Sequence, residues 1–153
     1  MSQWSETDIA YLAGIVEFGG QITIKKYKDS RSKNILYSSV FIINSSNTDF
    51  IKRLVSSFGG QLITRKTYGY KSSKLRWNCP SHLHHELFSL IHPLTFNRKS
   101  VVELLIKFLE IKKHAGKRSS NPIDDIKKEE IYQELIHTEN RLCHIGARSG
   151  KIV

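Results

Sequence analysis

The sequence predicts an α+β fold in which one helix is followed twice by a strand–strand–helix unit. Apolar residues recur at helical spacing between residues 9 and 16, the pattern breaks at Gly19-Gly20, and residues 21–24 alternate like a strand. Strand-like pairs then precede two helical segments, within residues 21–58 and 61–92. We expect one domain over residues 1–153, because this length can bury a substantial hydrophobic core.

The first half of the chain predicts a helix, a hairpin and a second helix. The first helix is expected to end at Gly19-Gly20, and its candidate N-caps are Ser5, Thr7 and Asp8. Residues 21–28 predict a strand with Ile22 and Ile24 on its core face. A polar turn at 29–34 leads to a β-branched and aromatic segment at 35–44, which predicts the partner strand.

The second half repeats the order and adds helices. Asn47 is placed to cap a helix that closes at Gly59-Gly60. Segments 61–67 and 70–78 predict two strands, and a third helix follows until Pro93 ends it. Two further helices are expected at about 98–113 and 122–142, and the tail at 143–153 is expected to be flexible. The core of the domain then spans about residues 8–113.

Positive charge is concentrated in one third of the chain. The net charge is +10, and residues 25–76 hold twelve Lys or Arg but two acids. The rest of the chain is neutral, so the charge is not a general solubility feature. A localised excess of this kind favours an anionic partner such as nucleic acid over a merely solvated face.

Membrane and secretory patterns are missing from the sequence. No apolar run approaches the ~20 residues that a membrane span needs, and the N-terminus has no signal-peptide pattern. Two cysteines, Cys79 and Cys143, fit a reduced compartment better than a disulfide framework. An intracellular protein without a membrane partner is therefore expected.

Residues 12–20, LAGIVEFGG, resemble the nine-residue LAGLIDADG signature of homing endonucleases. Leu, Ala, Gly, two aliphatic residues and an acid occupy the first six positions, and the closing glycine is present. The resemblance covers about residues 8–113 and implies an α-ββα-ββα fold whose curved antiparallel four-stranded sheet lies over the major groove of a long DNA target. The chain departs from the family at the eighth position, where Gly19 replaces the catalytic Asp or Glu.

A single signature implies a homodimer in which the first helices of two copies pair. The residues expected at this interface are Leu12, Ala13, Ile15 and Val16. Small residues such as Ala13 and Gly14 let two helix backbones approach closely. A two-fold dimer predicts a palindromic or pseudo-palindromic DNA site.

Cleavage of a phosphodiester requires a divalent ion that stabilises charge and activates water. The resemblance implies Mg²⁺ or Mn²⁺ at the foot of the first helix, and the oxygen ligands available there are the Glu17 carboxylate and the Gly19 carbonyl. Glu17 lies two residues before Gly19, which rotates its side chain by roughly 200° on a helix. A helix cap or ion-pair partner is therefore the alternative role for Glu17.

Two further positions complete the candidate catalytic set. Arg98, with Lys99 beside it, falls where the family has a lysine, and arginine keeps the charge but cannot shuttle a proton. Asn44 or Ser45, at the end of the second strand, could orient water. An endonuclease is therefore implied by the resemblance but with an altered active site.

The predicted strands carry the expected DNA contacts, because Lys and Arg neutralise phosphates and polar side chains read base edges. The assigned contacts are Lys25, Lys28, Arg31, Lys33, Arg65, Lys71, Lys74 and Arg76. Weaker candidates are Gln21, Thr23, Tyr27, Tyr68 and Tyr70.

Three functions remain open from the sequence. The first is sequence-specific binding of double-stranded DNA with metal-dependent cleavage. The second is a non-cleaving DNA-binding regulator, or an RNA maturase-like splicing factor, on the same fold. The third is a basic interaction protein without a nucleic-acid partner. A zinc site is also conceivable at Cys79, His82, His84 and His85, but their spacing is poor and exposed helix histidines are the preferred interpretation.

Overall fold

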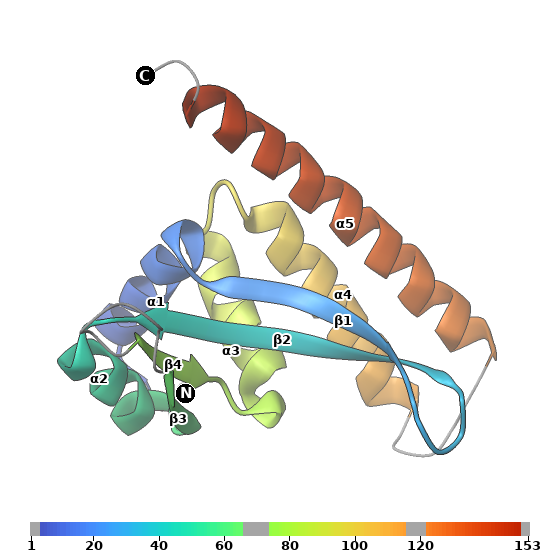
Figure 1. Ribbon diagram of the computed structural model, residues 1–153, viewed down its shortest axis with the longest axis horizontal. Coiled ribbons are helices and arrows are strands. Elements are labelled where there is room, and N and C mark those ends of the chain that lie inside the picture. Colours follow the sequence, from blue (N-terminus) through green and yellow to red (C-terminus); the bar gives the residue numbers. More distant parts are fainter. Residues whose placement is uncertain (1–3, 66–73, 116–121, 151–153) are drawn as a thin grey trace.

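The computed structural model describes residues 4–65, 74–115 and 122–150 (Figure 1). Its elements follow the predicted order. They are helix α1 (Glu6–Phe18), strands β1 (Gln21–Lys28) and β2 (Ile35–Ser45), helix α2 (Thr48–Phe58), strands β3 (Gln61–Arg65) and β4 (Lys74–Asn78), helix α3 (His84–Ile91), and helices α4 (Lys99–Ala115) and α5 (Pro122–Gly150). Short 3₁₀ turns at Ser81–Leu83 and His92–Leu94 flank α3.

Local sequence explains where the first helices begin and end. The Ser5 hydroxyl accepts a hydrogen bond from the Asp8 amide at the start of α1, and the Asn47 side chain accepts one from the Phe50 amide at the start of α2. Each bond satisfies a backbone donor that the helix itself leaves unpaired. Gly59 ends α2 at a positive φ of 73°, a region that favours glycine.

The four strands form one antiparallel sheet in the order β1-β2-β4-β3 (Figure 1). Gln21 pairs with Ile42 across β1 and β2, and Ile42 pairs in turn with Asn78 of β4. The two hairpins therefore join at the centre of the sheet, through β2 and β4. This is the α+β architecture that the sequence predicted.

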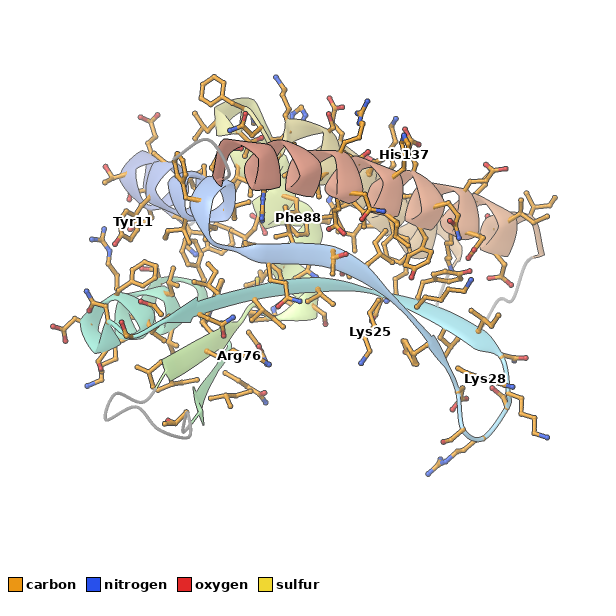
Figure 2. All side chains as sticks on the ribbon, turned by 45° about the horizontal axis from the view of Figure 1, so that its top comes forward. Tyr11, Lys25, Lys28, Arg76, Phe88 and His137 are labelled. Carbon is orange, nitrogen blue, oxygen red and sulfur yellow. The ribbon has the colours of Figure 1, made fainter. Side chains whose placement is uncertain are left out.

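The hydrophobic core lies between the helices and one face of this sheet. Strand residues at alternate positions are buried, namely Ile22, Ile24, Phe41, Ile43, Leu75 and Trp77. Phe41 stacks on Phe88 of α3, with ring centroids 4.9 Å apart, and meets Trp77 edge-on at 5.6 Å. The helices thus cover one face, while the sheet curves and leaves its other face open (Figure 2).

Two boundaries differ from the sequence expectation. Helix α5 continues to Gly150, beyond the expected end near residue 142. Helix α3 spans only His84–Ile91, because its first and last turns are 3₁₀. None of the described helices is long and apolar enough to cross a membrane.

Candidate nucleic-acid interface

The uncovered side of the sheet, here called the open face, carries polar and basic residues on β1 and β4 and mostly apolar residues on β2. The strand register puts alternate residues on it, and none of these residues is buried. They are Gln21, Thr23, Lys25, Tyr27, Leu36, Ser38, Val40, Ile42, Asn44, Gln61, Ile63, Arg76 and Asn78. The prediction that Ile22 and Ile24 lie on the core face of β1 is confirmed.

Lys25 and Arg76 mark the two halves of the open face. Both lie on the side of the sheet away from α5 and α3 (Figure 2). The Arg76 Nε donates to Asn44 Oδ1 at 3.1 Å, and the Lys25 ammonium lies 5.9 Å from the centre of the Tyr27 ring. These contacts orient two cations outward over the sheet, where a phosphate or base edge could reach them.

The distal part of the β1–β2 hairpin, residues 25–37, is called the hairpin arm. Its turn is organised by Asp29, whose carboxylate accepts from the Arg31 amide and the Ser32 hydroxyl. Because Asp29 is used internally, the arm presents the exposed side chains of Lys28, Arg31 and Lys33. The sequence-assigned contacts in this hairpin are thus accessible.

The other assigned residues fall at the second hairpin. Arg65 pairs with Lys74 at the ends of β3 and β4 through their backbones. Lys71, with the weaker candidates Tyr68 and Tyr70, lies outside the described residues. Gln61 is exposed at the start of β3, opposite Asn78.

The foot of α1 is tied to the turn before α4 through Glu17. Its carboxylate accepts hydrogen bonds from the backbone amides of Phe96, Asn97 and Arg98 at 3.0 to 3.1 Å. Burial acts to raise the pKa of Glu17, but these three bonds outweigh it and hold the pKa below its usual range. Both oxygens accept from these backbone amides, which holds the Glu17 carboxylate against the turn before α4.

Gly19 leaves room for a side chain at the position of the missing acid. The nearest atom to a Cβ built there would be the Ile15 carbonyl oxygen, at 4.0 Å. Its φ of −158° lies outside the left-handed region that favours glycine. At Gly20, by contrast, a Cβ would lie 3.1 Å from the Val16 Cα. The fold therefore demands a small residue at position 20 but not at position 19.

Arg98 is the basic group at this foot, and α5 contributes a carboxylate beside it. The Arg98 guanidinium donates to the Gly20 carbonyl. Burial raises the pKa of Glu139 in α5, while a hydrogen bond with Thr23 and attraction to Arg98 oppose that rise. Sequence reasoning missed Glu139, because nothing local links it to residues more than 40 positions away.

The two remaining candidate catalytic residues are Lys99 and Asn44. Lys99 is exposed at the start of α4, and the register puts Asn44 at the end of β2 nearest α1.

The expected dimer residues face the interior of the molecule. Leu12, Ala13 and Val16 are 0%, 1% and 0% exposed, and Ile15 packs against the same core. These residues pack against the protein's own sheet and helices, and the expectation that they pair with a second copy remains a prediction. The exposed strip of α1 consists of Thr7, Ala10, Gly14 and Phe18.

The histidine-rich segment is partly buried, contrary to the expectation of exposed side chains. His84 is 3% exposed, its Nδ1 lies 2.6 Å from the Ser39 hydroxyl, and its Nε2 lies 3.1 Å from the Cys79 carbonyl. Both ring nitrogens are thus occupied by the protein. Cys79 is free and buried.

The chain has the fold of LAGLIDADG homing endonucleases. It superposes on the archaeal intron-encoded homing endonuclease I-Vdi141I complexed with DNA, with a TM-score of 0.70 and 12% identity over 87% of this chain and 84% of that one. I-CvuI in complex with its target in the presence of Ca gives 0.67 and 12% over 86% and 82%. I-TnaI gives 0.62 and 19% over 90% and 97%.

Sequence comparison does not detect the relationship that the structures show. No family model matches the chain, and no curated protein matches it. The likeness is therefore one of fold, and it agrees with the signature resemblance at residues 12–20.

Proposed function

We propose that this protein binds a specific double-stranded DNA site through the open face and the hairpin arm. The observation that carries the proposal is the coincidence of the basic segment with the uncovered face of the curved sheet, where Lys25 and Arg76 point away from the helices (Figure 2). The polar residues Gln21 and Ser38 lie on the same face as Lys25. Cations of this kind bind phosphates, and the interleaved polar groups offer base readout.

We propose further that the protein as it stands is a binder and not an efficient nuclease. The fold's solved examples include complexes with Mg or Ca present. In this chain the residues at the foot of α1 fit such an ion poorly, because Glu17 is occupied by three backbone amides. Among the described residues, no three His, Cys, Asp or Glu side chains group closely enough to hold a metal. We therefore assign no cleavage step to this protein.

The salt dependence of DNA binding tests the proposal. We expect Lys25→Gln and Arg76→Gln to weaken binding and to reduce the slope of log K against log salt by about 0.9 for each phosphate that the variant no longer neutralises. The measurement is a titration at several salt concentrations with a duplex selected from a randomised library. The matched control is Lys107→Gln, which removes the same charge from the exposed side of α4. A wild-type protein that does not bind DNA at moderate salt would overturn the proposal.

We also propose that the protein acts as a homodimer paired through the exposed strip of α1. Phe18 is 89% exposed, and Phe96, whose backbone amide donates to Glu17, is 82% exposed. Within the described residues, a Cβ at Gly14 would meet nothing within 4 Å, so the monomer itself does not require glycine there. A glycine inside a helix costs about 1 kcal/mol relative to alanine, and close approach of a second helix would explain it.

A bulky residue at Gly14 is therefore expected to separate the dimer without unfolding the chain. Gly14→Leu should sediment as a monomer at concentrations where the wild type is dimeric, and its circular dichroism spectrum should be unchanged. Ser56→Leu, which adds the same side chain at an exposed position of α2, serves as the control. A wild-type protein that sediments as a monomer would contradict the homodimer.

A further inference from the structure

One cluster of polar side chains connects the C-terminal helix to the hairpin arm. Glu129 of α5 lies 103 residues from Lys26 of β1, yet its Oε1 is 2.9 Å from the Lys26 ammonium. Its other oxygen accepts a hydrogen bond from the Tyr37 hydroxyl of β2. Gln133, one turn further along α5, donates to Oε1 at 2.9 Å. A single carboxylate thus bonds both strands of the arm.

Aromatic rings complete this cluster. The Lys26 ammonium lies 5.9 Å from the centre of the Tyr37 ring and 5.5 Å from that of Tyr132. The two rings meet edge-on, with centroids 5.9 Å apart. The cluster of Lys26, Tyr37, Glu129, Tyr132 and Gln133 is called the brace. Here α5 contacts the side of the sheet opposite the open face, on which Lys25 lies (Figure 2).

The adjacent lysines Lys25 and Lys26 lie on opposite faces of the sheet and have different roles. Lys25 is exposed on the open face, whereas Lys26 points to the helices and has its charge matched by Glu129. Donated bonds from Tyr37, Gln133 and Lys26 lower the pKa of Glu129 to about 2, so the carboxylate is ionised at neutral pH. Burial and the bond to Glu129 raise the pKa of the Tyr37 hydroxyl, which therefore remains protonated and can donate.

Few other contacts support the arm. From Lys25 to Tyr37 no side chain is fully buried, and Tyr37 is the one hydrophobic side chain of this segment that packs against the core. Beyond Lys26 and Tyr37, the arm consists of exposed or half-exposed residues and a turn held by Asp29. A two-stranded ribbon without a packed face is marginally stable in water. The position of the arm relative to the rest of the sheet therefore depends on its contacts with α5 at Lys26 and Tyr37.

We infer that Glu129 is a positioning residue for DNA binding: through Lys26 and Tyr37 it fixes the hairpin arm so that Lys28, Arg31 and Lys33 meet the DNA together with the open face. The inference rests on the proposed function for its DNA part. An arm that is ordered before binding loses less conformational freedom on the DNA, which raises affinity without a new contact.

Two substitutions break the brace in different ways. Glu129→Gln removes the charge that holds Lys26, and Tyr37→Phe removes one hydrogen bond without changing charge. Glu130→Gln is the matched control, since Glu130 is an exposed neighbour on α5 and makes no side-chain hydrogen bond within the described residues. Removal of an acid by itself makes the protein more cationic and favours DNA binding. Weaker binding by Glu129→Gln would therefore oppose the charge effect.

The first measurement is amide hydrogen exchange of the free protein. Glu129→Gln and Tyr37→Phe should exchange about tenfold faster than the wild type in residues 26–37, while Glu130→Gln should not. Exchange in α1 and α3 should stay unchanged, which separates local release of the arm from general destabilisation. Equal exchange in all four proteins would overturn the inference, whatever the protein binds.

The second measurement is DNA affinity against salt, with a duplex selected by the wild-type protein. Both brace variants should bind about tenfold more weakly and show a shallower salt slope, because the released arm no longer neutralises its phosphates. Faster exchange with unchanged affinity and slope would overturn the positioning role and leave the proposed function intact. If the wild type fails to bind DNA, the proposed function and the DNA part of the inference both fail. The exchange data then test only whether Glu129 orders the hairpin arm.

Discussion

Gly19→Asp is expected to confer magnesium-dependent nuclease activity on the proposed DNA binder. The position has space for a Cβ, and its φ lies outside the left-handed region that favours glycine. An aspartate there would add the oxygen ligands that a divalent ion prefers, next to the Gly20 carbonyl and Arg98. A bound metal contributes several kcal/mol of charge stabilisation, so the cleavage rate should rise by about a hundredfold or more over the parent.

The test is cleavage of a supercoiled plasmid that carries the selected site, with and without Mg²⁺. Gly19→Asn is the matched control, because it has the same size and shape but no charge. It should bind as the parent does and leave the DNA uncut. Removal of the metal with a chelator should abolish cleavage by Gly19→Asp. A variant that binds normally and cuts no faster than Gly19→Asn would show that this position does not limit catalysis, and a parent that cuts efficiently would refute the binder proposal.

Glu17→Gln is expected to lower stability by about 2 kcal/mol, because hydrogen bonds to a charged acceptor are worth about 1.5–3 kcal/mol. Glutamine keeps one acceptor oxygen but turns an amide donor towards the backbone amides of Phe96, Asn97 and Arg98. The midpoint of thermal unfolding at pH 7 should fall by about 4–8 °C for a chain of this length. Glu134→Gln, on the exposed face of α5, should leave it unchanged.

The destabilisation should depend on pH in a defined direction. The pKa of Glu17 is lowered on folding, so the unfolded chain takes up its proton first as the pH falls. The stabilisation is complete above the ordinary pKa of 4.5 and disappears as the pH passes below the folded value. The difference between the parent and Glu17→Gln should therefore shrink in acid. An equal unfolding temperature for both at pH 7 would contradict the capping role.

Local sequence signals determined most of the elements. The caps at Ser5 and Asn47, the alternation of residues 21–28 and the breaks at paired glycines define helices and strands within a few residues. Each signal depends on neighbours in the chain, which is why it can be read without a fold. The concentration of charge at residues 25–76 and the signature at 12–20 likewise needed no coordinates.

Tertiary structure alone decided which faces are covered and which distant groups meet. Periodicity showed that Leu12, Ala13 and Val16 share one side of α1, but not that the protein's own core would cover that side. It could not join Glu17 to the turn before α4, nor Glu129 to Lys26, because those contacts span 79 to 103 residues. Sequence patterns thus specify which side chains act together on one element. Only packing specifies what lies opposite them, since that depends on the order of the strands and on where each helix crosses the sheet.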